Sequence, residues 1–87
     1  MDDADRSRLR VIVADDDAFT RSLVADGLRS QGFEVSTAGT VTDAWSLVLE
    51  VDPHALISDL NFGPGDSGAS LLARVHEEAP WVALVVL

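Results

Sequence analysis

Aspartates stand at the ends of two short apolar segments of this chain. Asp15 and Asp16 directly follow the segment from Leu9 to Ala14 (LRVIVA), and Asp59 closes a second apolar segment, HALISD. Carboxylate oxygens are the ligands that Mg²⁺ takes in proteins, usually through a few side chains and several waters. Two carboxylates about 5 Å apart repel by roughly 3 kcal/mol at an effective dielectric constant of about 20, so a cluster of them favours a bound cation. These three aspartates are candidates for a magnesium site.

Both apolar segments are typical of β-strands that are buried on both faces. They are short, rich in apolar residues and bounded by polar ones. In an open parallel sheet, ligands bind outside the carboxyl ends of the strands, and neighbouring first and third strands, as in the order 2-1-3-4-5, would bring the three carboxylates into one crevice. Taken singly, Asp15 and Asp16 also fit capping or turn positions, and Asp59 fits the start of a turn. Their joint placement carries the hypothesis.

The rest of the chain alternates between strand-like and helix-like periodicity. Strands are predicted over 9–14, 33–38, 54–60 and 81–87, and helices over 18–31, from Thr40 to Asp52, and over 69–78. This alternation predicts one α/β unit, a parallel sheet with helices on both faces. The glycine-rich stretch 61–68 is expected to form the loop between the third strand and the third helix.

The first predicted helix carries an apolar stripe. Phe19, Leu23 and Leu28 recur close to the helical repeat, so we expect them to face the core, with Arg21 on the outward side. Asp17 precedes this stripe and is placed to cap the helix. Because capping accounts for Asp17 fully, it is left out of the candidate magnesium site.

The composition excludes several classes of function. The 87 residues carry a net charge of −9 and contain no lysine, which is the wrong sign for binding nucleic acid. Without cysteine, the chain forms neither a disulfide nor a thiolate metal site. Its longest apolar run, 81–87, is far shorter than a membrane span, and its acidic and basic start does not resemble a signal peptide. The sequence predicts a cytoplasmic domain over 9–87 that follows a flexible tail, 1–8, and that binds neither membranes nor nucleic acid.

Two motifs in register connect the chain to a known family. VIVADDDAFTR, from Val11 to Arg21, resembles the opening of bacterial response-regulator receiver domains: a strand, an acidic pair, and an arginine five residues after the pair. LISDLN, from Leu56 to Asn61, is similar to the family's phosphorylation strand, and its aspartate follows Asp16 by 43 residues, a gap that suits the family. The resemblance covers the chain from the first predicted strand onward. It implies a flavodoxin-like parallel sheet, β-α-β-α-β-α-β, in a protein of two-component signalling.

The resemblance also implies a role for each candidate residue. Asp59 would be the phosphoacceptor, attacking a phosphohistidine on a sensor histidine kinase. Asp16 and Asp59 would bind Mg²⁺ directly, with the backbone carbonyl of Asn61 as a third ligand, and Asp15 would complete the acidic pocket through water. Phosphoryl transfer depends mainly on positioning and on neutralising charge, which suits carboxylates with a divalent cation. The resemblance implies a signalling domain rather than an enzyme.

The sequence departs from the family pattern in two places. The loop after Asp59 normally carries a Met-Pro pair, whereas here it reads NFGPGDSG and is one residue longer. The chain also ends inside the fourth predicted strand, so the family's switch Ser or Thr, its phosphate-pairing Lys and its last two helices are not among these residues. An apolar strand left at the edge of a sheet predicts self-association or pairing with another segment, such as an output domain.

Three other functions fit parts of the sequence. A receiver-like interaction module that phosphorylation does not regulate fits the missing lysine and switch hydroxyl. GPGDSG, 63–68, matches the dinucleotide-binding pattern G-x-G-x-x-G, but Asp59 and Asp66 would repel phosphates, and a tight turn explains the glycines. The pattern D-x-D at 15–17 occurs in haloacid-dehalogenase-like phosphohydrolases, which need further motifs that 87 residues do not supply.

Overall fold

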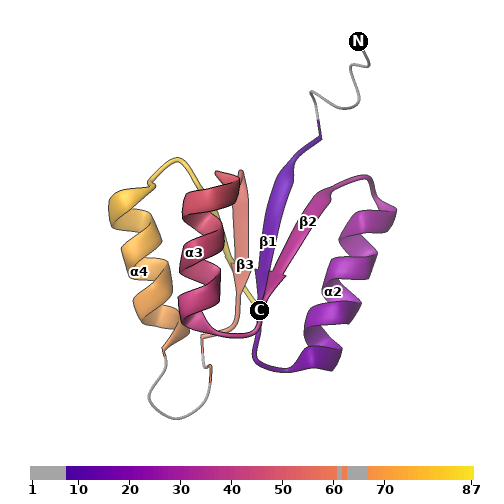
Figure 1. The fold of residues 1–87 in the computed structure, drawn as a ribbon, viewed down its shortest axis with the longest axis horizontal. Helices are drawn as coiled ribbons and strands as arrows, with labels where there is room; N and C mark the ends of the chain where they lie inside the picture. Colours follow the sequence, from indigo (N-terminus) through magenta and orange to yellow (C-terminus); the bar gives the residue numbers. More distant parts are fainter. Residues whose placement is uncertain (1–7, 61, 63–66) are drawn as a thin grey trace.

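Strands and helices alternate along the whole described chain (Figure 1). The computed structural model describes residues 8–60, 62 and 67–87, so the tail predicted for 1–8 lies outside the described residues except for Arg8. The elements are β1 (Arg10–Ala14), α2 (Ala18–Ser30), β2 (Glu34–Ala38), α3 (Val41–Val51), β3 (Ala55–Ser58), α4 (Gly68–Glu78) and β4 (Ala83–Val86). The predicted α/β alternation is confirmed, with the third and fourth strands shorter than expected.

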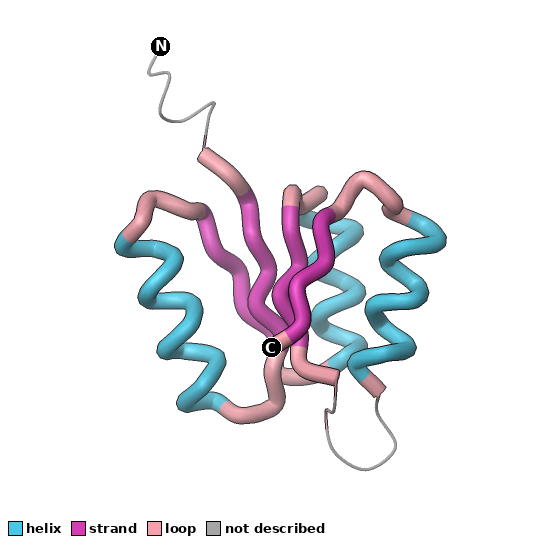
Figure 2. Tube along the Cα trace, turned by 180° about the vertical axis from the view of Figure 1, so that it is seen from behind, coloured by secondary structure: helices cyan, strands magenta, loops and turns pink. Residues whose placement is uncertain are grey.

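The strands form one parallel sheet in the order β2-β1-β3-β4. Ala14 at the end of β1 pairs with Ala38 on β2 and with Ser58 on β3. Figure 2 shows the sheet from behind, with the strands side by side between the helices. The predicted neighbourhood of the first and third strands is confirmed. Because the two strands are parallel and level, their carboxyl ends meet at one edge of the sheet, where the strand order reverses.

Side-chain caps fix where the helices begin. Asp17, Thr40 and Ser67 are the N-caps of α2, α3 and α4, and each accepts a hydrogen bond from the amide three residues on. The cap at Ser67 starts α4 one residue earlier than predicted. Asp52 ends α3 in the left-handed conformation, with φ 52°, and Pro53 follows it, as the predicted stop requires. None of the helices in the described ranges combines the length and the apolar character needed to cross a bilayer.

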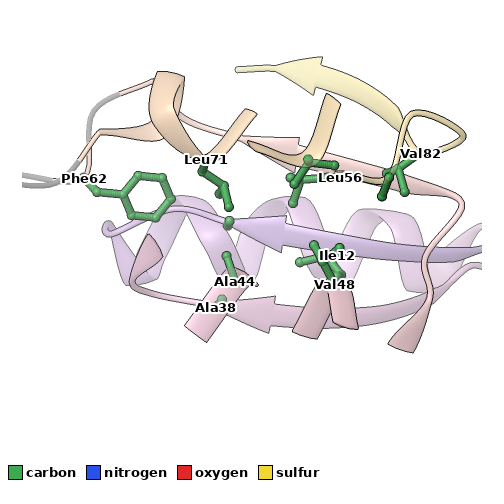
Figure 3. Packing of buried hydrophobic residues seen from close by; sticks show 11 residues of the cluster. Ile12, Ala38, Ala44, Val48, Leu56, Phe62, Leu71 and Val82 are labelled. Carbon is green, nitrogen blue, oxygen red and sulfur yellow. The ribbon is translucent and has the colours of Figure 1, made fainter. Parts of the chain in front are cut away.

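The core lies between the sheet and the neighbouring helices α3 and α4. Ile12 on β1 and Leu56 on β3 are fully buried there, against Val48 of α3 and Leu71 of α4. Figure 3 shows these side chains together, with Phe62 closing the end of the cluster next to Leu71. Burying each large apolar side chain stabilises the fold by about 1.5–3 kcal/mol. The strand ends that carry the aspartates are therefore anchored from one face of the sheet.

The described residues cover the opposite face of the sheet only in part. Val13, Ile57 and Val85 form one row across this face on β1, β3 and β4. Along the row, exposure rises from zero at Val13 to 47% at Val85, and Ile57 is half-buried. The cover stops in the middle of the sheet because α2 packs against β1 and β2. We call the surface around Ile57 and Val85 the open face.

The predicted inward stripe of α2 is wrong for two of its three residues. Phe19 is 74% exposed and Leu23 is 63% exposed, whereas Ala25 is fully buried and Leu28 is half-buried. The helix meets the sheet through Arg21, Ala25 and Leu28, which recur at intervals of four and three residues and share one side of the helix. Phe19 and Leu23 lie on the other side. The small side chain of Ala25 lets the helix approach the sheet closely.

Candidate functional site

Three aspartates meet at the carboxyl edge of the sheet. Asp15 and Asp16 follow β1, and Asp59 follows the neighbouring strand, β3. One carboxylate oxygen from each lies within 4.8 Å of the other two. The pairing of Ala14 with Ser58 makes the two strand ends level, and this is why the acids that follow them converge. The convergence predicted from the sequence is confirmed.

The three carboxylates differ in their exposure to solvent. Asp15 is buried, with 4% of its surface exposed, Asp59 is half-buried and Asp16 is exposed. The cluster therefore opens to solvent through Asp16 and Asp59, and Asp15 closes it from inside. Because solvent screens like charges, the repulsion of exposed Asp16 is screened best, and the repulsion between Asp15 and Asp59 is screened less.

The carboxylates of Asp15 and Asp17 accept hydrogen bonds from different groups. One carboxylate oxygen of Asp15, Oδ1, accepts a hydrogen bond from the amide of Asp17 at 2.9 Å. Asp17 turns toward α2, where Oδ2 accepts from the hydroxyl of Thr20 at 2.5 Å and from its amide at 3.3 Å. The hydroxyl, followed by the amide, lowers the pKa of the Asp17 carboxyl below its ordinary value. Asp17 is the helix cap that the sequence predicts.

Arg21 positions the cluster, and the prediction that it points outward is wrong. Its Nη1 donates a hydrogen bond to the backbone carbonyl of Asp15 at 2.7 Å, and the side chain is half-buried. The guanidinium fits against Gly39, where a Cβ would lie 2.9 Å from Nη1. A charged residue on an amphipathic helix usually faces solvent, so the sequence pattern did not predict the contact of Arg21 with Asp15. The sequence signal for it is the spacing of Arg21 from the acidic pair.

Two neighbours fix the backbone of Asp59. The hydroxyl of Ser58, a buried polar side chain, donates to the carbonyl of Asp59 at 2.8 Å. A Cβ on Gly68 would overlap that same carbonyl oxygen, so only glycine fits there. The amide of Gly68 in turn donates to the carbonyl of Leu60 at 2.9 Å. Gly68 thus lets the first turn of α4 pack directly on the end of β3.

Parts of the predicted site lie outside the described residues. These are Asn61, the expected third ligand through its carbonyl, and 63–66, which carry most of the G-x-G-x-x-G pattern. Phe62, between them, is buried in the core beside α4. The loop that follows Asp59 is therefore tied to the core one residue beyond Asn61.

The donor set of the cluster fits a hard divalent cation. Every side chain in it offers a carboxylate oxygen, and the described residues add no histidine to the group. Mg²⁺ prefers such oxygens, keeps several of its waters and takes only one or two carboxylates directly. The cluster is open to solvent at Asp16 and in part at Asp59, whereas Asp15 is buried. The arrangement can hold a hydrated cation beside an accessible carboxylate.

Comparisons with known sequences place this geometry in a family. The sequence model of the response regulator receiver domain matches residues 11–87. Protein-glutamate methylesterase/protein-glutamine glutaminase 2 of Rhodopseudomonas palustris (strain BisB18) is 37% identical over 73 residues, which are 83% of this chain and 20% of that protein. Oxygen regulatory protein NreC of Staphylococcus epidermidis is 33% identical over 81 residues, which are 91% of this chain and 37% of that protein. The chain thus spans well under half the length of these curated relatives.

Solved structures share the fold. A response regulator receiver domain protein (CheY-like) from Methanospirillum hungatei JF-1 superposes with a TM-score of 0.86 at 22% identity, over 92% of this chain and 63% of that chain. The chemotaxis response regulator CheY4 of Vibrio cholerae gives a TM-score of 0.79 at 23% identity, over 90% of this chain and 68% of that chain. The family's sequence model and this shared fold cover nearly all of the described chain. The chain belongs to the response regulator receiver domain family.

Proposed function

We propose that this chain is the phosphoacceptor domain of a two-component response regulator and that Asp59 accepts the phosphoryl group. The observation that carries the proposal is the acidic cluster: in a sheet of the receiver family, Asp59 lies with Asp15 and Asp16 within 4.8 Å. Of the three, Asp59 combines partial access to solvent with a backbone that Ser58 and Gly68 hold in place. A nucleophile needs both properties.

The proposed reaction is a transfer from phosphohistidine on a sensor histidine kinase. A carboxylate oxygen of Asp59 attacks phosphorus, the new O–P bond forms as the N–P bond breaks, and the imidazole leaves with the bonding electrons and takes up a proton. A carboxylate is a weak nucleophile, so the rate depends on positioning and on neutralised charge. The contacts of Ser58 and Gly68 with the Asp59 carbonyl supply the positioning.

In this proposal Asp16 and Asp59 hold Mg²⁺ directly, the carbonyl of Asn61 completes the protein ligands, and Asp15 contributes through water. When bound, the cation neutralises charge on the phosphoryl oxygens. Three carboxylates without it would repel an approaching phosphate. Arg21 holds the Asp15 carbonyl at 2.7 Å and so keeps the inner wall of the cluster in place.

The proposed setting is the cytoplasm, where the kinase would meet the exposed side of the cluster. Because the chain spans 20% and 37% of two curated relatives, we place the output activity in other segments or partners. With a charge of −9 and no lysine, these residues are not proposed to bind nucleic acid. Self-association through the open face is a further part of the proposal.

Intact-mass spectrometry after incubation with Mg²⁺ and acetyl phosphate tests the acceptor role. We expect one phosphoryl adduct on the wild type and none on Asp59→Asn or in metal-free buffer. Asp26→Asn, at an exposed site on α2, is the matched control and should keep the adduct. Circular dichroism on each sample establishes that the protein is folded. A folded wild type without an adduct, or an adduct that persists in Asp59→Asn, would overturn the proposal.

A receiver-like interaction module that phosphorylation does not regulate is the second candidate, and the exposed apolar side chains of Phe19 and Leu23 on α2 favour it. Titration calorimetry with Mg²⁺ separates the two functions. Millimolar binding that Asp16→Asn abolishes supports the phosphoacceptor, whereas a folded protein that binds no Mg²⁺ supports the module.

A further inference from the structure

A groove of about 230 Å³ lies between the carboxyl ends of α3 and α4. Its walls are mainly apolar: Trp45 and Trp81 face it together with Pro53 and Val82. Figure 1 shows that α3 and α4 end at the top of the view, whereas β1 and β3 end at the bottom. The groove is therefore at the opposite end of the sheet from the acidic cluster, and it shares no residue with it.

Two acidic residues, Asp52 and Glu78, line the groove, and among the described residues only Glu78 has an ion-pair partner. Glu78 is paired with Arg74 at 3.1 Å, and Arg74 lies over the ring of Trp45 with its guanidinium carbon 4.1 Å from the centroid. Arg74 is not among the lining residues, so this pair neutralises Glu78 from outside the groove. Asp52 is different, because no described residue forms an ion pair with its carboxylate.

The carboxylate of Asp52 is nevertheless held in place. Its Oδ1 accepts a hydrogen bond from the indole nitrogen of Trp81 at 3.3 Å. Arg10 approaches the same residue, but its Nη2 donates to the backbone carbonyl at 2.8 Å and not to the carboxylate. The groove thus combines an indole wall with one oriented negative charge next to it.

We propose that this groove binds a small organic cation, an apolar body that carries one ammonium group. The apolar body would displace water from Val82 and Pro53, and the ammonium group would meet Asp52 and the face of Trp81. Small-molecule sites are usually larger, about 300–1,000 Å³, so the ligand is a single ring or a short chain. The net charge of −9 raises the local concentration of cations and disfavours anions.

Fluorescence titration reports on this site directly, because the two tryptophans of the chain both line the groove. The probe is 2-phenylethylammonium, and 2-phenylethanol is its uncharged counterpart. We expect a saturable fluorescence change with the ammonium in the millimolar range, and binding of the alcohol weaker by about fivefold to tenfold. Added salt should weaken binding of the ammonium and leave that of the alcohol unchanged.

The variant Asp52→Asn removes the charge with little change in structure. Asparagine adopts the left-handed conformation at φ 52° readily, and its amide oxygen can still accept from Trp81. It should weaken binding of the ammonium about fivefold and leave the alcohol unaffected. Glu50→Gln makes the same charge change at an exposed residue outside the groove and should bind the ammonium like the wild type.

Two outcomes would overturn the proposal. One is equal affinity for the ammonium and the alcohol, or no saturable change with either. The other is an effect of Asp52→Asn no larger than that of Glu50→Gln. Proton NMR of the indole N–H groups checks the location separately, since a ligand in the groove must shift the Trp81 signal. Neither readout depends on Mg²⁺ or on phosphorylation of Asp59.

Discussion

At the residue scale, the three aspartates of the cluster have unequal environments. Asp15 is buried, and its carboxylate is already bonded to the amide of Asp17. Asp59 is half-buried and Asp16 is exposed. Solvent screens the charge of Asp16 best, so repulsion within the cluster falls mainly on Asp15 and Asp59. The structure therefore separates an inner pair of carboxylates, Asp15 and Asp59, from an outer, exposed one, Asp16.

The first prediction follows from this repulsion. In metal-free buffer, Asp59→Asn should raise the free energy of unfolding by on the order of 1 kcal/mol, because a crowded like charge disappears. Asp16→Asn should act in the same direction but less, since Asp16 is exposed. Urea unfolding with a chelator present measures both changes. Mg²⁺ should stabilise the wild type more than either variant. Unfolding midpoints that are equal to or below the wild-type value in both variants would show that these carboxylates do not crowd one another.

At the element scale, the close packing of α4 on the end of β3 depends on one glycine. The first turn of α4 lies so near Asp59 that a side chain at Gly68 would overlap the backbone carbonyl. Gly27, inside α2, is the opposite case, because a Cβ there would meet nothing within 4 Å. The two glycines allow the cost of crowding to be separated from the effect of helix propensity.

The second prediction compares the same substitution at these two glycines. Gly68→Ala should destabilise the fold by about 2 kcal/mol, since backbone atoms must move apart to admit the methyl group. Gly27→Ala should stabilise it by about 0.5–1 kcal/mol, as alanine does in an open helix interior. Chemical unfolding of both variants measures the difference. If Gly68→Ala is neutral or stabilising, the contact between α4 and the Asp59 backbone is not as tight as described. We also expect Gly68→Ala to slow phosphoryl uptake, because Asp59 would shift.

The sequence pattern predicts best those strands that are buried on both faces of the sheet. β1 and β3 read as apolar runs followed by acids, and this was enough to predict the convergence of Asp15, Asp16 and Asp59. The side of α2 that faces the sheet is not predictable in this way. Its exposed apolar residues outnumber its buried ones, so the pattern pointed to Phe19 and Leu23 rather than to the side of Ala25.

Contacts between a helix and the backbone just after a strand were also hidden from the sequence. In the sequence, Gly68 is one of several glycines of a turn. Glycine is required there because α4 packs against the backbone carbonyl of Asp59. Arg21 reads as a surface charge, and its hydrogen bond to Asp15 arises from the docking of α2. In both cases the deciding atom is a backbone carbonyl oxygen just after a strand, and the pattern of side-chain types along a helix does not report such an atom.

At the scale of the whole molecule, the sheet is covered unevenly. Two helices pack over one face, and α2 covers β1 and β2 on the other, which leaves the open face at Ile57 and Val85. Phe19 and Leu23 add exposed apolar surface on α2. Exposed apolar surface of this kind favours association with another protein surface, because burying it releases about 25 cal/mol per Å².

The third prediction is that the 87-residue polypeptide self-associates through the open face. Sedimentation velocity should show a concentration-dependent shift toward dimers at high micromolar protein. Val85→Lys should weaken this shift, because it places a charge in the row formed by Val13 and Ile57. Val86→Lys is the matched control: it is exposed to a similar extent, 49% against 47%, but points to the other side of β4 and should associate like the wild type. An equal loss in both variants would instead indicate pairing along the edge of β4, where either lysine acts as a gatekeeper. A polypeptide that stays monomeric at every concentration would show that the open face does not drive association.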